Sequence, residues 1–532
     1  MRVSFRLDGE DVAAADETVS LLDVIREGLG ARSPKDGCSP QGQCGCCTVW
    51  VDGAPRVACV TPVRRVAGRQ VTTLEGLDPT ARQRWVQAFV DHGASQCGFC
   101  TPGIVMRLVA LEGHTGPAGL DEAAVGRALA AHLCRCTGWR TIFDAARAAT
   151  SEAPASESRP RDWIAAAERA ELEGASAQCV GPDVVLGRGG FTDDTAPADA
   201  LVAVPGDHGD WVVAETAVLA RSAAGRVPGR NSTRSLRHPL EFPSGDFVLR
   251  LRTTFVEPAY LEPDASWCVP GGLPASPLAN GGAFGGKRSS PLPAVAIRLA
   301  DEHGRPVRVL YSREDVARRG PKRPPIAAGV RADGSGVIRV ATTPGSADLA
   351  SWRKAVASVS AAFEVEEVAV AGPPVSPDIR GAGWAEAAVL RAVWEMLPDC
   401  EVGAGRPVTV RAGDGATATV TLADGAVSVE VAAGAVLDEV VLRSYVVGAV
   451  HQGLSWVRSE GLAVDDDGEV LNLTVRSFGV LPARHMPEVR VVVEHQDGPP
   501  RRVGDAVLAA AAAAAWLAGG LSPDWPLERG GS

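Results

Sequence analysis

The chain has 532 residues, of which 45% are hydrophobic and 22% are charged. This length is enough for about three or four domains, and the composition is that of a globular protein, which excludes a disordered, collagen-like or membrane-embedded chain. The 53 basic and 64 acidic residues give a net charge of −11, so no overall positive field would draw the protein onto nucleic acid or an anionic membrane.

No part of the sequence has the pattern of an export signal or a membrane span. The start MRVSFRLDGE lacks the apolar core of a signal peptide, and the most apolar stretch, residues 506–521, is rich in alanine and has glycines near its end. We therefore expect a cytoplasmic protein without a membrane partner, in which residues 506–521 form a packed helix.

Cysteines are concentrated at the beginning of the chain, where nine of the twelve come before residue 140. In a chain without an export signal, clustered cysteines indicate metal or redox chemistry rather than disulfides. The first group has the spacing C-x5-C-x2-C-x11-C and consists of Cys38, Cys44, Cys47 and Cys59. Glycines at positions 37, 42 and 45 would let backbone N–H groups approach the sulfur atoms of an iron–sulfur cluster.

Short strands are predicted around this first group. Apolar residues alternate at positions 3, 5 and 7, and the Asp-Gly pairs at 8–9 and 52–53 are typical of hairpin turns. One short helix over 21–29 would lie across the sheet. The cysteine spacing resembles that of plant-type ferredoxins, with one extra residue between the first two cysteines. Residues 1–77 are therefore predicted to be a β-grasp 2Fe-2S ferredoxin domain.

Zinc is the alternative metal for this group. Zinc sites usually pair two C-x2-C knuckles, however, and the first group has only one. Cys46, which lies between Gly45 and Cys47, is interpreted as a bystander rather than a ligand.

A second cysteine group lies in a part of the chain with helical periodicity. Cys97 and Cys100 stand in QCGFCTPG, and Cys134 and Cys136 stand in HLCRCTGWR. Four helices are predicted, with starts after Asp78, at Thr101, after Asp121 and after Gly138. Cys100 and Cys136 would then come just before helix N-termini, whose free N–H groups stabilise an anionic cluster. Residues 78–150 are predicted to be a four-helix bundle that binds a second 2Fe-2S cluster.

Both cysteine groups, in this order and with these flanks, resemble the iron–sulfur half of the xanthine dehydrogenase and aldehyde oxidase family of molybdenum hydroxylases. The resemblance spans residues 1 to about 150, and QCGFCTPG followed by CRCTG is its most specific part. It implies two 2Fe-2S clusters in series, the helical one nearer the molybdenum cofactor and the ferredoxin-like one nearer a flavin. The implied iron ligands are Cys38, Cys44, Cys47, Cys59, Cys97, Cys100, Cys134 and Cys136.

The remainder of the chain is predicted to be a linker over 151–175, which begins with SEAPASESRPR, and an α+β region over 176–532. Within that region we expect strands at 248–254 and 307–311, a helix at 384–396, and a β-rich stretch between 397 and 437.

Segments of this second half resemble the molybdenum-cofactor domain of the same family, in the family's order: LEPDASWCVP, GGAFGGK, VLYSREDVARRGPKRPP, IRGAGWAEAA and VVGAVHQGLSW. Taken alone, the glycine run would be a tight structural turn. The resemblance implies cofactor contacts for a set of residues: Gln96, Cys136, Gly282, Phe284 and Gly285. It also implies that Arg380 lies in the substrate pocket and that Asp505, one methylene shorter, replaces the family's catalytic glutamate.

The second half is shorter than in the family, and it has no counterpart of the glutamine-bearing segment or of the Gly-Gln and serine-rich stretches that grip the pterin. These gaps favour an electron-transfer component, which relays electrons from a molybdenum-binding subunit to an FAD-binding subunit or to another acceptor, with FAD only in the partner. The complex would oxidise a small heterocycle or aldehyde. The alternatives are a complete hydroxylase that holds its own molybdenum cofactor, and a redox sensor without turnover.

Overall fold

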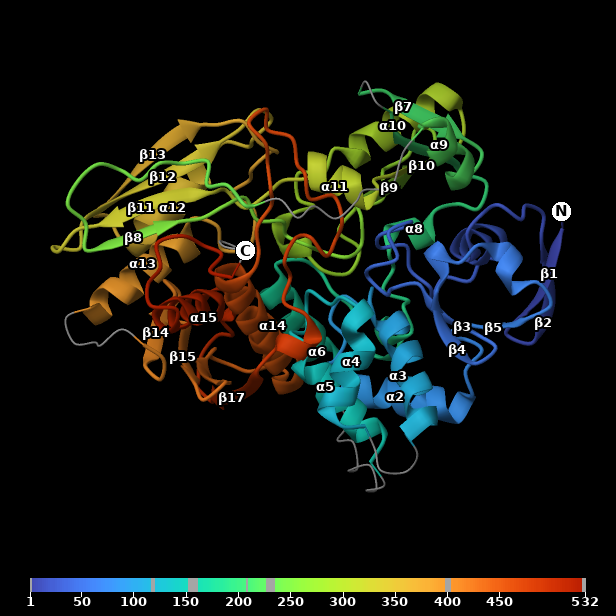
Figure 1. Ribbon diagram of the computed structural model, residues 1–532, viewed down its shortest axis with the longest axis horizontal. Coiled ribbons are helices and arrows are strands. Elements are labelled where there is room, and N and C mark those ends of the chain that lie inside the picture. The colour runs from blue at the N-terminus through green and yellow to red at the C-terminus, as the bar shows by residue number, and fades with distance from the viewer. Residues whose placement is uncertain are drawn as a thin grey trace.

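The chain forms a multidomain α+β fold, as predicted. The computed structural model describes residues 2–115, 120–151, 161–206, 209–225, 235–397 and 403–528. The first domain lies at one end of the molecule with the helical domain beside it, and the second half extends from the first domain to the opposite end (Figure 1).

The first domain is built on a five-stranded sheet in the order β2-β1-β5-β3-β4. Its main elements are β1 (Val3–Leu7), β2 (Glu10–Ala14), α1 (Leu21–Asp23), a π-helical turn (Val24–Gly28), β3 (Thr48–Val51), β4 (Ala54–Val57) and β5 (Gln70–Thr72). The alternation of β1 buries Val3, Phe5 and Leu7. Both predicted Asp-Gly turns connect hairpins, and β1 pairs in parallel with β5. The predicted β-grasp sheet is therefore present.

The helical domain contains the four predicted helices, which are α2 (Pro79–Asp91), α3 (Thr101–Thr115), α4 (Glu122–Ala128) and α5 (Arg140–Ala149). Asp78 caps α2 by accepting the Ala81 N–H, and Asp121 caps α4 by accepting the Ala124 N–H. Capping carboxylates satisfy N–H groups that have no partner inside the helix. Local sequence signals were thus enough to locate these helices.

The predicted linker over 151–175 is wrong for its second part. Residues 152–160 lie outside the described residues, but Trp163–Gly174 form helix α6, which begins after a capping aspartate. Ala166 and Ala170 bury one face of α6 against a longer helix of the second half. The Ser/Pro-rich composition ends just before α6, where a cap and an apolar i, i+4 pair supply what a packed helix needs.

The second half contains three four-stranded sheets among its described residues. The first sheet has the order β7-β6-β10-β9 and lies near the first domain (Figure 1). Its strands are β6 (Leu201–Pro205), β7 (Trp211–Ala214), β9 (Ala265–Cys268) and β10 (Val307–Leu310). The helices of this part are α7 (Pro182–Val185), α8 (Thr192–Thr195), α9 (Ala217–Ala223), α10 (Leu292–His303) and α11 (Arg313–Arg319).

The second sheet has the order β13-β12-β11-β8 and lies far from the first domain (Figure 1). Its strands are β8 (Leu249–Arg252), β11 (Ile326–Val330), β12 (Gly336–Thr342) and β13 (Phe363–Ala369), accompanied by α12 (Ala350–Val359) and α13 (Trp384–Met396). The strands predicted at 248–254 and 307–311 and the helix predicted at 384–396 are confirmed by β8, β10 and α13.

The third sheet confirms the β-rich stretch predicted between 397 and 437. It has the order β14-β15-β16-β17, with β14 (Pro407–Arg411), β15 (Thr417–Ala423), β16 (Ala426–Ala432) and β17 (Glu488–Glu494). Two helices pack beside it, α14 (Glu439–Arg458) and α15 (Gly504–Ala518). Small residues let these helices approach closely, since a Cβ on Gly453 would lie 2.6 Å from the Leu508 carbonyl oxygen.

Helix α15 confirms the packed helix predicted at the apolar stretch near the C-terminal end. Thirteen of its residues are buried, from Gly504 to Leu517 with the exception of Asp505. None of the helices that the structure describes is long and apolar enough to cross a membrane.

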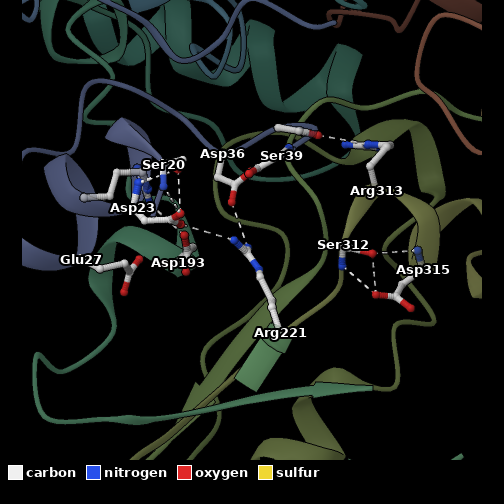
Figure 2. Close-up of polar contacts among 12 residues, drawn as sticks. Ser20, Asp23, Glu27, Asp36, Ser39, Asp193, Arg221, Ser312, Arg313 and Asp315 are labelled. Atoms are coloured by element: carbon white, nitrogen blue, oxygen red, sulfur yellow. Dashed lines mark hydrogen bonds and ion pairs between the residues drawn. The ribbon is translucent and has the colours of Figure 1, made fainter. Parts of the chain in front are cut away.

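Charged side chains fasten the first 150 residues to the second half. Figure 2 shows Arg221 of α9 reaching the first domain, where its guanidinium lies 2.9 Å from the Asp36 carboxylate and 3.8 Å from that of Asp23. Arg135 of the helical domain and Glu460 form a bidentate ion pair that is almost fully buried. Removing one partner of a buried pair such as Arg135–Glu460 costs about 3–5 kcal/mol, so this pair holds the helical domain and the second half in one arrangement.

Replacing Gly448 is expected to push α14 away from the helical domain. A Cβ at this position would lie 1.9 Å from the Cys136 carbonyl oxygen, so Gly448→Ala should lower stability by about 1–3 kcal/mol, the usual cost of overpacking. Gly113→Ala is the control, because Gly113 is an exposed glycine of α3 with no atom near its Cβ position, and alanine favours helix there. The apparent melting temperature checks both, and an unchanged value for Gly448→Ala would contradict this packing.

Candidate functional site

The first cysteine group lies in the loop before β3 and just after β4. All four members are buried: Cys38, Cys44, Cys47 and Cys59. Burial disfavours thiolates, and backbone N–H groups point at two of the four sulfur atoms. The N–H groups of Gln43 and Cys44 lie 3.4 and 3.3 Å from the Cys38 sulfur, and the Cys59 N–H lies 3.4 Å from the Cys47 sulfur. Such donors also stabilise the sulfur atoms of an iron–sulfur cluster.

Two glycines of this loop adopt backbone angles that other residues avoid. Gly42 has φ +69° and Gly45 has φ +74°. There is also no room for a side chain at Gly45, because a Cβ there would lie 2.4 Å from the His132 ring. On the other side, a Cβ on Gly103 of α3 would lie 2.2 Å from the Gly45 carbonyl oxygen. The first cysteine loop therefore packs directly on the helical domain.

The thiols of the second cysteine group lie in two pairs. The sulfur atoms of Cys97 and Cys136 are 3.6 Å apart, and the Cys100 thiol donates to the Cys134 sulfur. This hydrogen bond, together with the Thr137 hydroxyl 3.1 Å away, lowers the pKa of Cys134 to about 6 although burial opposes the shift. Two pairs of thiols suit a two-iron cluster, which takes four cysteine ligands.

Only one cysteine of this group immediately precedes a helix. Cys100 comes just before α3, as predicted, but the prediction for Cys136 is wrong because α5 begins only at Arg140. Gly138 and Trp139 have φ values of +59° and +69°, which a right-handed helix does not allow. Two residues with positive φ, Gly138 and Trp139, therefore separate Cys136 from the start of α5.

Cys46, the bystander of the sequence prediction, is buried, and its thiol points at the Cys44 carbonyl oxygen from 3.8 Å. Within the described ranges, no three His, Cys, Asp or Glu side chains are arranged as ligands of a single metal ion, and the thiols of the second group lie in two pairs. The ligand set of eight cysteines stays a prediction with which these positions agree.

A cavity of about 300 Å³ lies beside the second cysteine group, between the helical domain and the second half. The predicted residues on its walls are Gln96, Cys97, Cys100, Cys136, Gly282, Phe284, Gly285 and Arg380, whereas Asp505 is not among the wall residues. The fold thus brings residues predicted from both halves to one place. The Gln96 side chain spans the boundary, because its amide donates to the Cys136 carbonyl at 3.1 Å and to the Ser444 hydroxyl at 3.0 Å.

The glycine run on the cavity wall is held by close backbone packing. Gly285 has φ +88°, and a Cβ there would lie 1.7 Å from the Asp378 carbonyl oxygen, so only glycine fits. Phe284 also has a positive φ of +54°, and its carbonyl accepts the Arg380 N–H at 2.8 Å. This contact fixes the backbone from which the Arg380 side chain extends.

Asp505 contacts two arginines of the cavity wall. Its Oδ1 atom lies 3.1 Å from Arg380 Nε and 3.1 Å from Arg502 Nη2. Burial raises the pKa of Asp505, but the Arg502 and Arg380 guanidinium groups outweigh burial and hold this pKa below its usual value. The carboxylate is therefore ionised at neutral pH.

The cavity also has donors suited to an anionic ligand. Arg380 Nη2 and Arg502 Nε, which belong to residues of the cavity wall, are buried without a hydrogen-bond partner. The Ser176 hydroxyl, which is not on the wall, also lacks a partner. A Cβ on Gly282 of the glycine run would lie 3.2 Å from the Ser176 hydroxyl oxygen. Because a buried unpaired donor costs about 1–3 kcal/mol, these residues fit a group that carries negatively charged oxygen atoms.

Several cavity residues have no motif in the sequence: Glu173, Gln178, Tyr260 and Tyr445. The Tyr445 hydroxyl donates to the Gln178 side chain at 2.6 Å. Glu173 lies in the helix that was predicted to be linker. Its only sequence signal is the four-residue spacing from Arg169, which is typical of an ion pair on one helix face.

Comparison with known proteins gives matches in the cysteine-rich part. A family model described as a 2Fe-2S binding domain matches residues 73–147. The chain is 41% identical over 150 residues to a nicotinate dehydrogenase subunit of Pseudomonas putida, a match that covers 28% of this chain and 93% of that protein. It is 39% identical over 132 residues to the aldehyde oxidoreductase of Megalodesulfovibrio gigas, covering 24% of this chain but only 14% of that enzyme.

Solved structures extend the likeness to the whole fold. The aldehyde oxidoreductase of Desulfovibrio desulfuricans matches with a TM-score of 0.71 over 99% of both chains, at 15% identity. The aldehyde oxidoreductase of Desulfovibrio gigas matches with a TM-score of 0.68 over 99% of both chains, at 16% identity. At these identities the likeness shows the fold alone.

Cys100→Ser is expected to remove the absorption and electron paramagnetic resonance signals of one cluster and to leave those of the other. Serine replaces a thiolate by a hydroxyl, which stays protonated near neutral pH and is a poor iron ligand. Cys46→Ser is the matched control, a buried cysteine outside both groups, and should keep both sets of signals. Spectra of Cys100→Ser identical to those of the unmodified protein would contradict the ligand assignment.

Proposed function

Because the chain belongs to the xanthine dehydrogenase and aldehyde oxidase family of molybdenum hydroxylases, we propose that it is itself a hydroxylase whose cavity takes the molybdenum cofactor. Three features carry this proposal: the cysteine pair Cys97–Cys136 on the cavity wall, Arg380 on the same wall with Asp505 paired to it, and the unpaired donors of Arg380 and Arg502. When bound, the cofactor supplies a two-electron redox centre for oxidation of a carbon–hydrogen bond.

The residues of the cavity divide into two roles in this proposal. The unpaired N–H groups of Arg380 and Arg502 would hold negatively charged oxygen atoms, since guanidinium groups bind such atoms strongly when buried. The backbone of the glycine run 282–285 would border the cofactor, and Gln96 would contact it from the iron–sulfur side.

Asp505 would accept a proton from the reaction. Hydroxylation of a heterocycle or aldehyde by water releases two protons and two electrons for each hydroxyl group added. An ionised carboxylate can take one of those protons, and a general base contributes about 10²–10⁴-fold to such a step. The two arginines that keep Asp505 ionised also fix its orientation.

The two electrons would leave through two 2Fe-2S clusters in series. Cys97 and Cys136 line the cavity, and the loop of the first cysteine group packs on α3 through Gly45 and Gly103. The acceptor beyond the first domain would be a partner with bound FAD, because the chain shows no flavin-binding motif of its own.

A second candidate is an electron-transfer component that serves a separate molybdenum-binding subunit. The 41% identical relative, which this chain covers almost completely, is by its name one subunit of a dehydrogenase. The stretches expected to grip the pterin are also absent from the sequence. The full-length likeness to aldehyde oxidoreductases favours the complete hydroxylase instead.

Metal analysis of the protein purified from its native host separates the two candidates. Two 2Fe-2S clusters require four irons per chain, and a complete hydroxylase should also hold one molybdenum per chain. Molybdenum found only in a co-purifying subunit would establish the second candidate in place of the first. Zinc in place of iron would contradict both.

Asp505→Asn is expected to lower kcat by about 10²–10⁴-fold, because the amide cannot accept a proton. Asp467→Asn is the control, since Asp467 is an exposed aspartate far from the cavity in sequence, and should keep the original rate. Iron content and cluster spectra should match the unmodified protein in both variants. A rate within a few-fold of the original for Asp505→Asn would rule out this carboxylate as the base.

A further inference from the structure

Helix α6, which joins the two halves of the chain, carries a buried ion pair next to the cavity. Arg169 and Glu173 lie one helical turn apart, are fully buried, and approach to 3.3 Å. Buried charges are costly unless they are paired and hydrogen-bonded. The hydrogen bonds of these two side chains identify the segment that the ion pair holds.

Both side chains bind the segment immediately before Asp505. The Glu173 carboxylate accepts the Val503 N–H at 3.2 Å and the Gly504 N–H at 3.0 Å, one on each oxygen. Arg169 donates to the Arg501 carbonyl at 2.8 Å. One turn of α6 therefore holds residues 501–504 by both N–H and C=O groups, through charge-assisted hydrogen bonds, which are stronger than neutral ones.

The Arg380 side chain also lies against this segment, at Gly504. A Cβ on Gly504 would lie 2.1 Å from Arg380 Nη2 and 3.0 Å from Glu173 Oε2. The Arg380 guanidinium and the Glu173 carboxylate therefore both lie close to the Gly504 Cα atom, which carries no side chain. Opposite charges at this spacing attract each other, so Glu173 also acts on the position of the Arg380 side chain.

Glu173 belongs to the cavity wall, but its side chain is fully buried and both of its oxygens accept backbone hydrogen bonds. Its carboxylate is therefore engaged with the groups it holds. Those groups are the backbone that carries Asp505 and the arginine that pairs with Asp505.

We propose that Glu173 is a positioning residue, which holds Asp505 and Arg380 in register with the cavity through the amides of Val503 and Gly504. This inference rests on the proposed function, from which the role of Asp505 is taken. A reacting group displaced by about 1 Å can lose about 10²-fold in rate, and the hydrogen bonds from Arg169 and Glu173 hold the backbone of residues 501–504 against such a displacement.

The test compares Glu173→Gln and Glu173→Ala with Glu171→Gln in the full-length protein. Glutamine keeps the volume of Glu173 but turns an NH2 group toward one of the two backbone N–H groups. Both Glu173 variants should lower kcat by about 10²-fold with KM little changed and the cluster absorption intact. Glu171 is exposed on the same helix, and its variant should behave as the unmodified protein.

Hydrogen–deuterium exchange supplies a readout that needs no activity. Loss of a hydrogen bond to a charged group should make the amides of residues 503 and 504 exchange about tenfold faster in the Glu173 variants. If the unmodified protein were inactive, the proposed function would fail, and exchange would still decide the inference.

Three results would overturn the inference: unchanged exchange at 503 and 504 in Glu173→Gln, an effect on KM alone, or an unchanged kcat. If Glu173→Ala loses its clusters through misfolding, Glu173→Gln decides. Loss of the clusters in Glu173→Gln as well would show that Glu173 serves folding rather than positioning.

Discussion

Burial of thiols beside backbone N–H groups is the constraint on which the first 150 residues depend. A buried thiolate is unfavourable unless donors surround it, so the loops must expose amides toward sulfur. In the first loop, the N–H groups of Gln43 and Cys44 follow Gly42 with its positive φ and point at the Cys38 sulfur. The sheet and the four helices supply the rigid frame that keeps these loops in place.

The second half completes the surroundings of the second cysteine group. Arg135, between two cysteines, donates to the Pro258 carbonyl at 3.0 Å and pairs with the buried Glu460. Asn280, just before the glycine run, donates to the Cys97 carbonyl at 3.1 Å. Cys97 and the residue before Cys136 are therefore tied to the second half, which fixes the cysteine group relative to the cavity. A fixed spacing suits electron transfer between a cavity and a cluster.

The second half closes around the cavity because its elements pack tightly. The stretch between 397 and 437 forms strands β14, β15 and β16, and α15 packs on β14 and β15. Helix α15 can lie against both α14 and this sheet because alanine dominates it. At its first turn, Asp505 meets the arginines of the cavity wall.

The sequence by itself determined the cysteine spacing, the four capped helices of the helical domain, the hairpins of the first domain and the family, because these depend on residues close together in the chain. It placed a linker where α6 lies, since the Ser/Pro-rich start hid the cap and the apolar pair that follow. Only the tertiary structure decided that Glu173 holds the backbone beside Asp505, more than 300 residues away. Such contacts leave no local pattern, because burial and hydrogen bonding between distant segments depend on the whole packed chain.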